Sequence, residues 1–378
     1  MKKLSDILPI SSWAKYGKTP FVIAGPCSAE TEQQVFETVR GIASGHKVHM
    51  LRAGIWKPRT RPNSFEGVGE VGLKWIMEAG KEVGLPVTLE VANAEHVEAA
   101  LKAGVDALWI GARTTVSPFH VQSIADALRG TDMPILVKNP VNPDLELWIG
   151  AIERFANAGL TKLAAIHRGF STYEKSICRN PPMWEIPIEL RRRHQNIPII
   201  VDPSHMAGTR ELIQPLSQQA LDMGFDGLMI ESHINPDKAC SDAKQQLTPE
   251  TLNHVLNSLI VRQPIFDSSV HVELSTLRSK IDRIDNYIME LLGERMGISE
   301  IIGEYKKENQ LAIHQSQRWA DIVKHAVGKG KANGLTEEFI IKFFQQIHNE
   351  SIYHQSKVFE KNQSPEQINH PKHIIVKE

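Results

Sequence analysis

Cationic side chains gather in one short stretch of the sequence, LRAGIWKPRTRPNSFEGVG at 51–69. Its first residues are apolar, like those of a buried strand, yet the stretch carries Arg52 and Lys57 and then the pair Arg59 and Thr60. Pro58 lies among these groups and Pro62 follows them, and both prolines restrict the backbone of the stretch. Guanidinium, ammonium and hydroxyl groups held close together bind phosphate or carboxylate oxygens. The stretch therefore predicts a site for a strongly anionic ligand.

Three further cations, Arg113, Lys138 and Arg168, stand where other apolar runs end. One Lys or Arg in such a place would be interpreted as a solvated loop charge. Several on one rim would repel one another in an empty site, so their gathering indicates a ligand that compensates the charge. Two phosphates, or a phosphate and a carboxylate, are the simplest ligands of this kind.

A second group of residues offers ligand atoms for a divalent metal. Cys27, His205, Glu231 and Asp242 supply a thiolate, an imidazole and two carboxylates, which Mn²⁺, Fe²⁺, Co²⁺ and Zn²⁺ accept. Each also has an ordinary structural interpretation: a small core cysteine, a hydrogen-bonded histidine, and carboxylates that pair with the arginines. The chain has no CxxC motif that would decide the matter, so the residues alone leave both interpretations open.

Eight apolar runs must position these residues. They alternate with helical patterns between residue 21 and about residue 234, and each is continuous, as in parallel strands buried on both faces. Eight evenly spaced units predict a (β/α)8 TIM barrel, with an open doubly wound sheet as the alternative. Barrel chemistry lies at the C-terminal strand ends, where these candidate residues stand. The runs are FVIAGP, VHMLRAG, PVTLEV, ALWIGA, PILVKN, LAAIHR, PIIVDP and GLMIES.

An all-helical region follows the barrel. From Glu273 apolar residues recur at alternating spacings of three and four, which predicts a long amphipathic helix to about Lys307, then shorter helices at roughly 315–330 and 336–358. Such a small unit cannot bury its apolar stripe alone, so we expect a homodimer through this region, or a higher oligomer. The predicted divisions are a barrel at 1–262, a linker at 263–272, a helical domain at 273–358 and a poorly ordered polar tail at 359–378.

Composition narrows the class of protein. Lys+Arg 43 against Asp+Glu 44 gives a net charge of −1, which argues against nucleic-acid or membrane partners. Three cysteines make no disulfide framework, and no apolar run has the length of a signal peptide or a membrane span. We therefore expect a cytoplasmic protein that acts on small molecules.

The motifs IAGPCS, RAGIWKPRTRPNSFEGVG, IGART, VKNP, HRG, VDPSH and SDAKQQL occur in this order over about residues 20–250. They resemble the type I synthases of 3-deoxy-D-arabino-heptulosonate 7-phosphate (DAHP), nearest their short β subgroup. The related octulosonate 8-phosphate synthases normally read KANR where this chain reads KPRT. The resemblance implies condensation of phosphoenolpyruvate with erythrose 4-phosphate.

The resemblance also implies a role for each candidate residue of the barrel. The metal, expected to be Mn²⁺, would be bound by Cys27, His205, Glu231 and Asp242. Phosphoenolpyruvate would be held by Arg113, Lys138 and Arg168, helped by Arg52 and Lys57. Erythrose 4-phosphate would be held by Arg59 and Thr60, and a supporting role would fall to Glu90.

Polar residues interrupt the apolar stripe of the helical region. Arg295 lies on that stripe, and Lys306 returns to within ~20° of its face. A cation on a core seam is costly unless an anion meets it. In the last helix Ser351 and Gln355 continue a row of apolar residues. The pattern alone fits a ligand site and a coiled-coil dimerisation arm equally well.

The stretches LRSKIDRIDNYIMELLGERMGISEIIGEYKKEN, QSQRW and HNESIYHQ resemble the all-helical chorismate mutases over residues 273–356. The best-known members have carboxylates beside the helix-two arginine, one of them near the substrate hydroxyl, where this chain has Gln315 and Trp319. The resemblance implies that Arg278 reaches across a dimer. The implied residues for chorismate or prephenate are Arg278, Arg295, Lys306, Arg318, Ser351 and Gln355.

Together the two resemblances imply a bifunctional shikimate-pathway enzyme. The barrel would form DAHP in a metal-dependent reaction, and the helical domain would convert chorismate to prephenate. Prephenate or chorismate bound to the helical domain would then inhibit the barrel. The alternative is a DAHP synthase whose helical domain is catalytically weak or inactive and serves as a sensor and dimerisation module.

Overall fold

The computed structural model describes residues 3–17, 20–57, 64–173, 176–262, 268–314 and 316–360, without the side chains of 268–273 and 316–317. The chain divides into two compact units, Met1–Pro264 and Ile265–Glu378.

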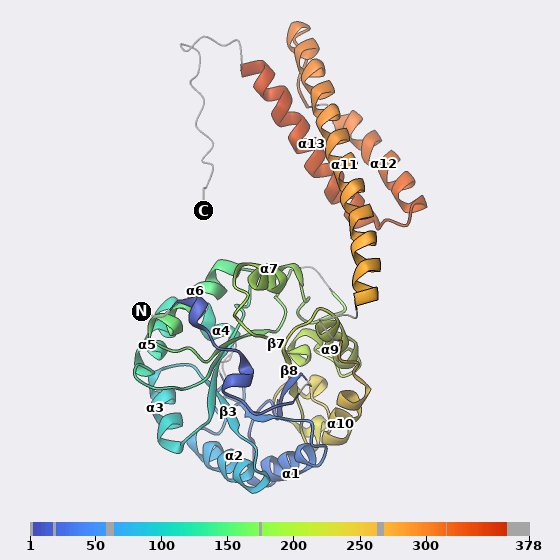
Figure 1. Cartoon of the computed structure of the whole chain (residues 1–378). Coiled ribbons are helices and arrows are strands. Elements are labelled where there is room, and N and C mark those ends of the chain that lie inside the picture. The colour runs from blue at the N-terminus through green and yellow to red at the C-terminus, as the bar shows by residue number, and fades with distance from the viewer. Residues whose placement is uncertain are drawn as a thin grey trace. The chain divides into compact units, whose positions relative to one another are not determined.

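The first unit is a closed barrel of eight parallel strands in the order β1 to β8, ringed by helices in Figure 1. The expected (β/α)8 fold is confirmed, and the open sheet is excluded because β1 pairs with β8 from Phe21–Gly227 to Gly25–Glu231. The strands are β1 Phe21–Gly25, β2 Met50–Ala53, β3 Val87–Val91, β4 Ala107–Ile110, β5 Ile135–Lys138, β6 Leu163–His167, β7 Ile199–Val201 and β8 Gly227–Glu231.

The helices of this unit follow the strands. Side-chain caps begin several of them: Thr31 accepts from the amide of Gln34, and Asp144 accepts from that of Leu147. The helices are α1 Glu32–Ala43, α2 Glu70–Val83, α3 Ala94–Ala103, α4 Ala112–Thr115, α5 Pro118–Ala127, α6 Leu145–Asn157, α7 Glu185–Arg193, α8 Pro203–Ala207, α9 Ile213–Asp222 and α10 Pro249–Ser258.

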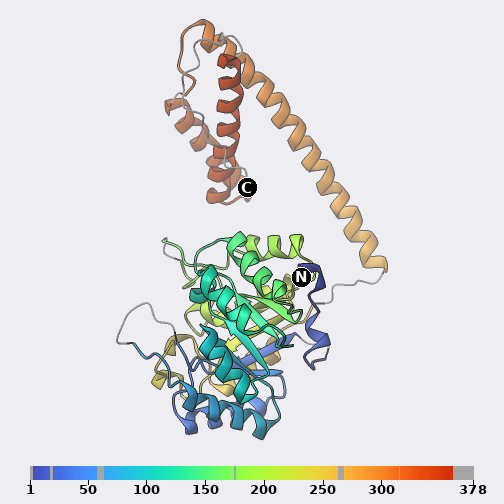
Figure 2. The same cartoon turned by 90° about the vertical axis from the view of Figure 1, so that its left-hand side faces the viewer.

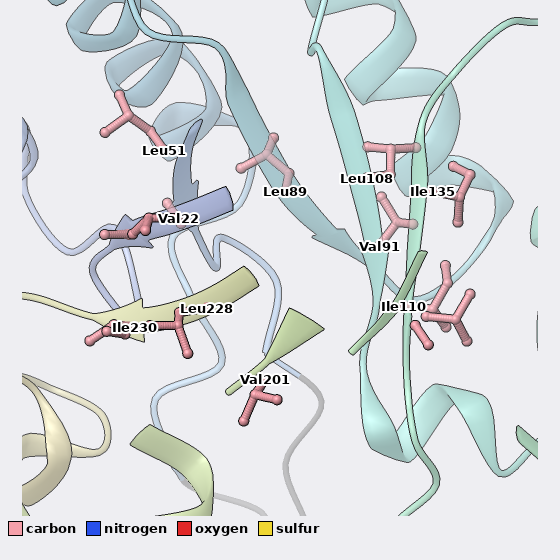
Figure 3. Close-up of a cluster of buried hydrophobic side chains, with 14 of the residues drawn as sticks. Val22, Leu51, Leu89, Val91, Leu108, Ile110, Ile135, Val201, Leu228 and Ile230 are labelled. Atoms are coloured by element: carbon pink, nitrogen blue, oxygen red, sulfur yellow. The ribbon is translucent and has the colours of Figure 1, made fainter. Parts of the chain in front are cut away.

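Successive side chains of each strand point alternately into and out of the barrel, which produces two hydrophobic cores. Phe21 and Ile23 belong to the core inside the barrel, whereas Val22 and Ala24 belong to the larger core that lies against the helices. Figure 3 shows part of the larger core, which includes Val22. Ile10, in the segment before β1, completes the inner core. Both strand faces are therefore buried, which explains the continuous apolar runs.

Gly25 allows β1 and β2 to approach closely beside the candidate site. A Cβ atom at this position would lie 2.0 Å from the carbonyl oxygen of Arg52. A side chain here would push β2 away and move the Arg52 side chain with it. The glycine of IAGPCS thus belongs to the geometry of the strand ends.

The second unit contains α11 Ser268–Glu308, α12 Ser316–Ala332 and α13 Glu337–Glu360. Figure 2 shows α11 as one long helix that extends past α12 and α13. It begins earlier than predicted: 268–272, assigned to the linker, are helical, and the rest of that linker lies outside the described residues. Thr336 caps α13 by accepting from the amide of Phe339. The predicted tail begins at 359, but residues 359–360 belong to α13; the rest of that tail lies outside the described residues.

Among the described residues no helix combines the length and apolarity needed to cross a bilayer. All three cysteines are free thiols: Cys27 and Cys178 are buried and Cys240 is exposed.

Candidate active site

A polar pocket lies at the C-terminal ends of the barrel strands. Its walls bring together side chains that are far apart in the sequence, which the closed barrel makes neighbours. Six Arg or Lys side chains line it, against the two carboxylates of Glu90 and Asp242. The cations are Arg52, Lys57, Arg113, Lys138, Arg168 and Arg179. Such a surface suits a ligand with several negative charges.

The candidate metal ligands converge next to this pocket. The ligand atoms of Cys27, Glu231 and Asp242 all lie within 4.8 Å of one another. His205 joins them, with its Nε2 atom 3.7 Å from Oε1 of Glu231. These residues come from the ends of β1 and β8, the loop after β8, and α8. A thiol, an imidazole and two carboxylates at this spacing fit a divalent cation.

Burial and local charge set the protonation of this cluster. Burial raises the pKa of the Cys27 thiol to about 12, and the charge of Glu231 adds to the effect. Burial alone would raise the pKa of Glu231, but the charges of His205 and Arg52 hold it below its usual value. The pKa of Asp242 is likewise lowered against the effect of burial, by His205 and Arg179. Two carboxylates thus stay ionised beside a neutral thiol, which a bound metal would deprotonate.

Asp202 organises the neighbouring strand ends. It caps α8 by accepting from the amide of His205, and its Oδ2 atom lies 2.8 Å from the Nδ1 atom of His205. The same oxygen accepts a hydrogen bond of 2.8 Å from the ammonium of Lys138. With Nδ1 beside Asp202, the Nε2 atom of the imidazole lies on the side of Glu231.

Arg52 and Lys57 support the cluster from β2 and the loop that follows. Arg52 is 1% exposed, lies 3.2 Å from Glu231 and stacks over the ring of Trp109 at 4.9 Å. Lys57 donates to the carbonyl oxygen of Cys27 at 2.8 Å and to its sulfur at 2.9 Å. Arg52 is buried and Lys57 is half-buried, and both cations offset the carboxylates, since unpaired buried charges would destabilise the fold.

Most of the sequence-predicted barrel residues meet at this place. Arg59 and Thr60 lie outside the described residues. The sequence reasoning missed Arg179, whose NH1 atom donates to Asp242 at 2.8 Å and to Gln245 at 3.1 Å. It also gave no role to Asp202, although the spacing in DPSH placed that carboxylate one helical turn from His205. Arg179 offered a weaker signal, a cation in the long loop after β6.

The helical unit holds a second polar cluster between α11 and α13. Arg295 donates a hydrogen bond to the hydroxyl of Ser351. Lys306 donates to Oε1 of Gln355 at 3.1 Å and to the carbonyl oxygen of Ile313 at 2.6 Å. Burial lowers the pKa values of Arg295 and Lys306. Two partly desolvated cations without a carboxylate at either of these contacts suit an anionic ligand.

The other predicted residues of the helical unit lie elsewhere. Arg278 and Arg318 are exposed, so the structure of one chain brings four of the six candidates together. Gln315 lies outside the described residues. Trp319 is half-buried and stacks on His348, with ring centroids 4.4 Å apart.

A parallel barrel with this pocket at its C-terminal end defines an enzyme that acts on anionic small molecules. Residues 13–263 match the family model of the DAHP synthetase I family, and residues 277–356 match that of chorismate mutase type II. The chain belongs to the DAHP synthetase I family and carries a chorismate mutase type II domain after the barrel. The two matches support both enzymatic activities, and the family generally depends on a divalent metal.

Curated relatives of two kinds are similar to the barrel. A phospho-2-dehydro-3-deoxyheptonate aldolase of Thermotoga maritima is 35% identical over 238 residues, which are 63% of this chain and 68% of the relative. A 2-dehydro-3-deoxyphosphooctonate aldolase of Desulfotalea psychrophila is 29% identical over 276 residues, 68% of this chain and 92% of the relative.

Solved structures are similar to the barrel as well. The crystal structure of phospho-2-dehydro-3-deoxyheptonate aldolase from Thermotoga maritima has a TM-score of 0.58 and 33% identity, covering 63% of this chain and 68% of that one. A truncated form of 3-deoxy-D-arabino-heptulosonate 7-phosphate synthase from Thermotoga maritima has a TM-score of 0.56 and 30% identity, covering 63% and 84%.

Proposed function

We propose that this chain is a bifunctional enzyme of the shikimate pathway. Its barrel condenses phosphoenolpyruvate with erythrose 4-phosphate to give DAHP and phosphate, and its helical unit converts chorismate to prephenate. The observation that supports the first activity is the cluster of Cys27, Glu231 and Asp242 beside a pocket lined by six cations. We also propose that the barrel at 1–262 carries the first activity and the helical domain at 273–358 the second. The helix that opens the helical domain starts at Ser268.

In the barrel reaction, carbon 3 of phosphoenolpyruvate attacks the aldehyde carbon of erythrose 4-phosphate. Water adds at carbon 2, and phosphate leaves by cleavage of its C–O bond. Lys138, Arg113 and Arg168 bind the phosphate and carboxylate of phosphoenolpyruvate, supported by Arg52 and Lys57. Burial lowers the pKa of Arg168 to about 10, so it remains charged at neutral pH and retains its attraction for an oxyanion.

The metal proposed for the cluster is Mn²⁺, with Fe²⁺, Co²⁺ or Zn²⁺ as alternatives. Cys27, His205, Glu231 and Asp242 would hold it, and when bound it would polarise the aldehyde carbonyl as a Lewis acid. Chelation should abolish phosphoenolpyruvate consumption, and added Mn²⁺ should restore it. Cys27→Ser should also lower the manganese retained after gel filtration, measured by elemental analysis. Unchanged retention would contradict the ligand assignment.

Lys138→Ala tests the phosphoenolpyruvate site. Loss of a charge-assisted hydrogen bond should raise the apparent KM for phosphoenolpyruvate by about 10- to 100-fold. Lys162→Ala is the matched control. Lys162 lies just before β6, at the end of the barrel opposite the pocket, and it pairs with Asp132. Steady-state kinetics with an unchanged KM for Lys138→Ala would refute the assignment.

In the helical unit, Arg295, Lys306, Ser351 and Gln355 bind the two carboxylates and the ether oxygen of chorismate. Hydrogen bonds to the ether oxygen strengthen as charge separates in the rearrangement, so no nucleophile is required. Arg318, and Arg278 from a second subunit, complete the site. Dimerisation is supported by the exposed apolar row Leu277, Ile281, Ile284, Ile288 and Leu291 on α11.

We place the enzyme in the cytoplasm, because its cysteines are free thiols. Prephenate or chorismate bound to the helical unit inhibits the barrel. Deletion of 263–378 should leave phosphoenolpyruvate consumption measurable but remove its inhibition by prephenate. Inhibition that survives the deletion would disprove this regulatory role.

A second function for the helical unit is that of a prephenate sensor without turnover. The observation that favours it is Trp319, which stacks on His348 where the best-known chorismate mutases have a carboxylate. Chorismate absorbance decides between the two functions. Loss of absorbance that Arg295→Ala abolishes supports the mutase. Stable absorbance together with prephenate inhibition of the barrel supports the sensor.

A further inference from the structure

The polar cluster of the helical unit contains His348, whose imidazole has no role in either of the proposed activities. His348 lies on α13 three residues before Ser351 and seven before Gln355, so the three side chains share one face of the helix. That face meets the cations of α11, since Ser351 contacts Arg295 and Gln355 contacts Lys306. His348 therefore belongs to the same polar cluster.

Two rings hold the imidazole of His348 in place. The ring of Trp319 from α12 is stacked on it, with centroids 4.4 Å apart and planes inclined by 22°. The ring of His314 meets it edge-on, with centroids 5.6 Å apart. An imidazole packed between two rings keeps one orientation, which is what a ligand contact requires.

The Nε2 atom of His348 is buried and has no hydrogen-bond partner among the described residues. Buried polar atoms in folded proteins are nearly always paired, so an atom of this kind points to a missing partner. In a proposed ligand site, an atom of the ligand can supply this partner.

The surroundings favour a neutral imidazole. Burial lowers the pKa of His348, and the neighbouring His314, Arg295 and Lys306 side chains lower it further. A neutral ring has one N–H group and one lone pair, so it can pair with a hydroxyl group. Carboxylates of the ligand are instead matched by the neighbouring Arg and Lys side chains.

We propose that His348 contacts the substrate of the helical unit, with Nε2 hydrogen-bonded to the ring hydroxyl of chorismate or prephenate, and that Trp319 positions its ring. This contact takes the place of the carboxylate that the best-known chorismate mutases have at the position of Trp319. The inference rests on the proposed function of the helical unit.

Two variants of the full-length chain separate hydrogen bonding from packing. His348→Phe keeps a ring for Trp319 to stack on but lacks the nitrogen, and His348→Gln keeps a polar group. The control is His325→Gln, at an exposed histidine of α12. Ligand dissociation constants are measured by calorimetry with prephenate and with a prephenate analogue that lacks the ring hydroxyl. The helix content of each variant is checked by circular dichroism.

The wild type should bind prephenate about three- to tenfold more tightly than the analogue. His348→Phe should bind both ligands equally, and His348→Gln should recover part of the difference. Trp319→Ala should also lose the discrimination, because the ring of His348 is then no longer held in place. A His348→Phe variant that still discriminates like the wild type overturns the inference. If the wild type binds neither ligand, the proposed function of the helical unit fails instead.

Discussion

At the scale of single residues, the barrel site is a network of buried charges that compensate one another. Arg52 lies beside Glu231, and Lys138 donates to Asp202, all four almost fully buried. Removing one member would leave its partner charged and unpaired, which costs more than the pair itself contributes. Substitutions in this network should therefore lower the stability of the barrel as well as its activity.

His167 provides a residue-scale test of burial. It is fully buried, and burial lowers its pKa to about 3. The unfolded chain, with an ordinary pKa near 6.5, binds a proton that the folded chain does not as pH falls from 7 to 5. The free energy of unfolding should thus fall by about 2 kcal/mol between pH 7 and pH 5 because of this histidine.

The measurement is the urea midpoint of the barrel, followed by tryptophan fluorescence at pH 7 and pH 5. The urea midpoint of His167→Phe should fall less between pH 7 and pH 5 than the midpoint of the wild type. His254→Gln, at an exposed histidine of α10, should behave like the wild type. Equal falls for His167→Phe and the wild type would contradict the prediction.

At the scale of elements, close helix contact sets the geometry of the helical site. Lys306 lies three residues after Gly303 on α11, and Gln355 lies opposite on α13. A Cβ atom at Gly303 would lie 3.2 Å from the Cα atom of Gln355. A glycine here therefore lets α13 come near enough for Gln355 to reach Lys306.

Two glycine substitutions on α11 test this contact. Gly293→Ala has no atom within 4 Å of the new Cβ, so it should stabilise the helix by about 1 kcal/mol. Gly303→Ala should lose that gain through crowding and should weaken prephenate binding. Thermal unfolding and calorimetry measure both effects. Equal stabilisation with unchanged prephenate affinity would show that the contact at Gly303 is not tight.

At the scale of the whole molecule, the helical unit leaves a long apolar row exposed. Ile284, at the middle of that row, is 53% exposed in the single chain. A second copy that packs along the row would bury it, as expected for the proposed dimer. The same dimer would bring Arg278 to the site of the partner subunit.

Ile284→Lys should therefore shift the protein from dimer toward monomer, because a buried lysine on the seam would be desolvated. Light scattering after gel filtration measures the mass, and the chorismate reaction should slow as Arg278 is withdrawn. Ser279→Lys, at an exposed position off the row, should leave the mass unchanged. A dimer that survives Ile284→Lys would place the interface elsewhere.

The sequence by itself determined the barrel and the type of chemistry. Strands buried on both faces leave continuous apolar runs, and eight of them predicted the barrel. The same reading put Cys27, Glu231 and Lys138 at strand ends, where a closed barrel makes them neighbours. Helical periodicity found α11 to α13 but placed the start of α11 five residues too late. The polar residues before Glu273 carry no periodic signal.

Only the tertiary structure decided which partners these residues have. Arg179 reaches Asp242 across 63 residues of sequence, and His348 meets Trp319 from a different helix. Such contacts depend on how loops and helices pack, and local patterns do not encode distances between segments far apart in the chain. The physical reason is that periodicity records which face of an element is buried, whereas pairing is set by which elements close on one another.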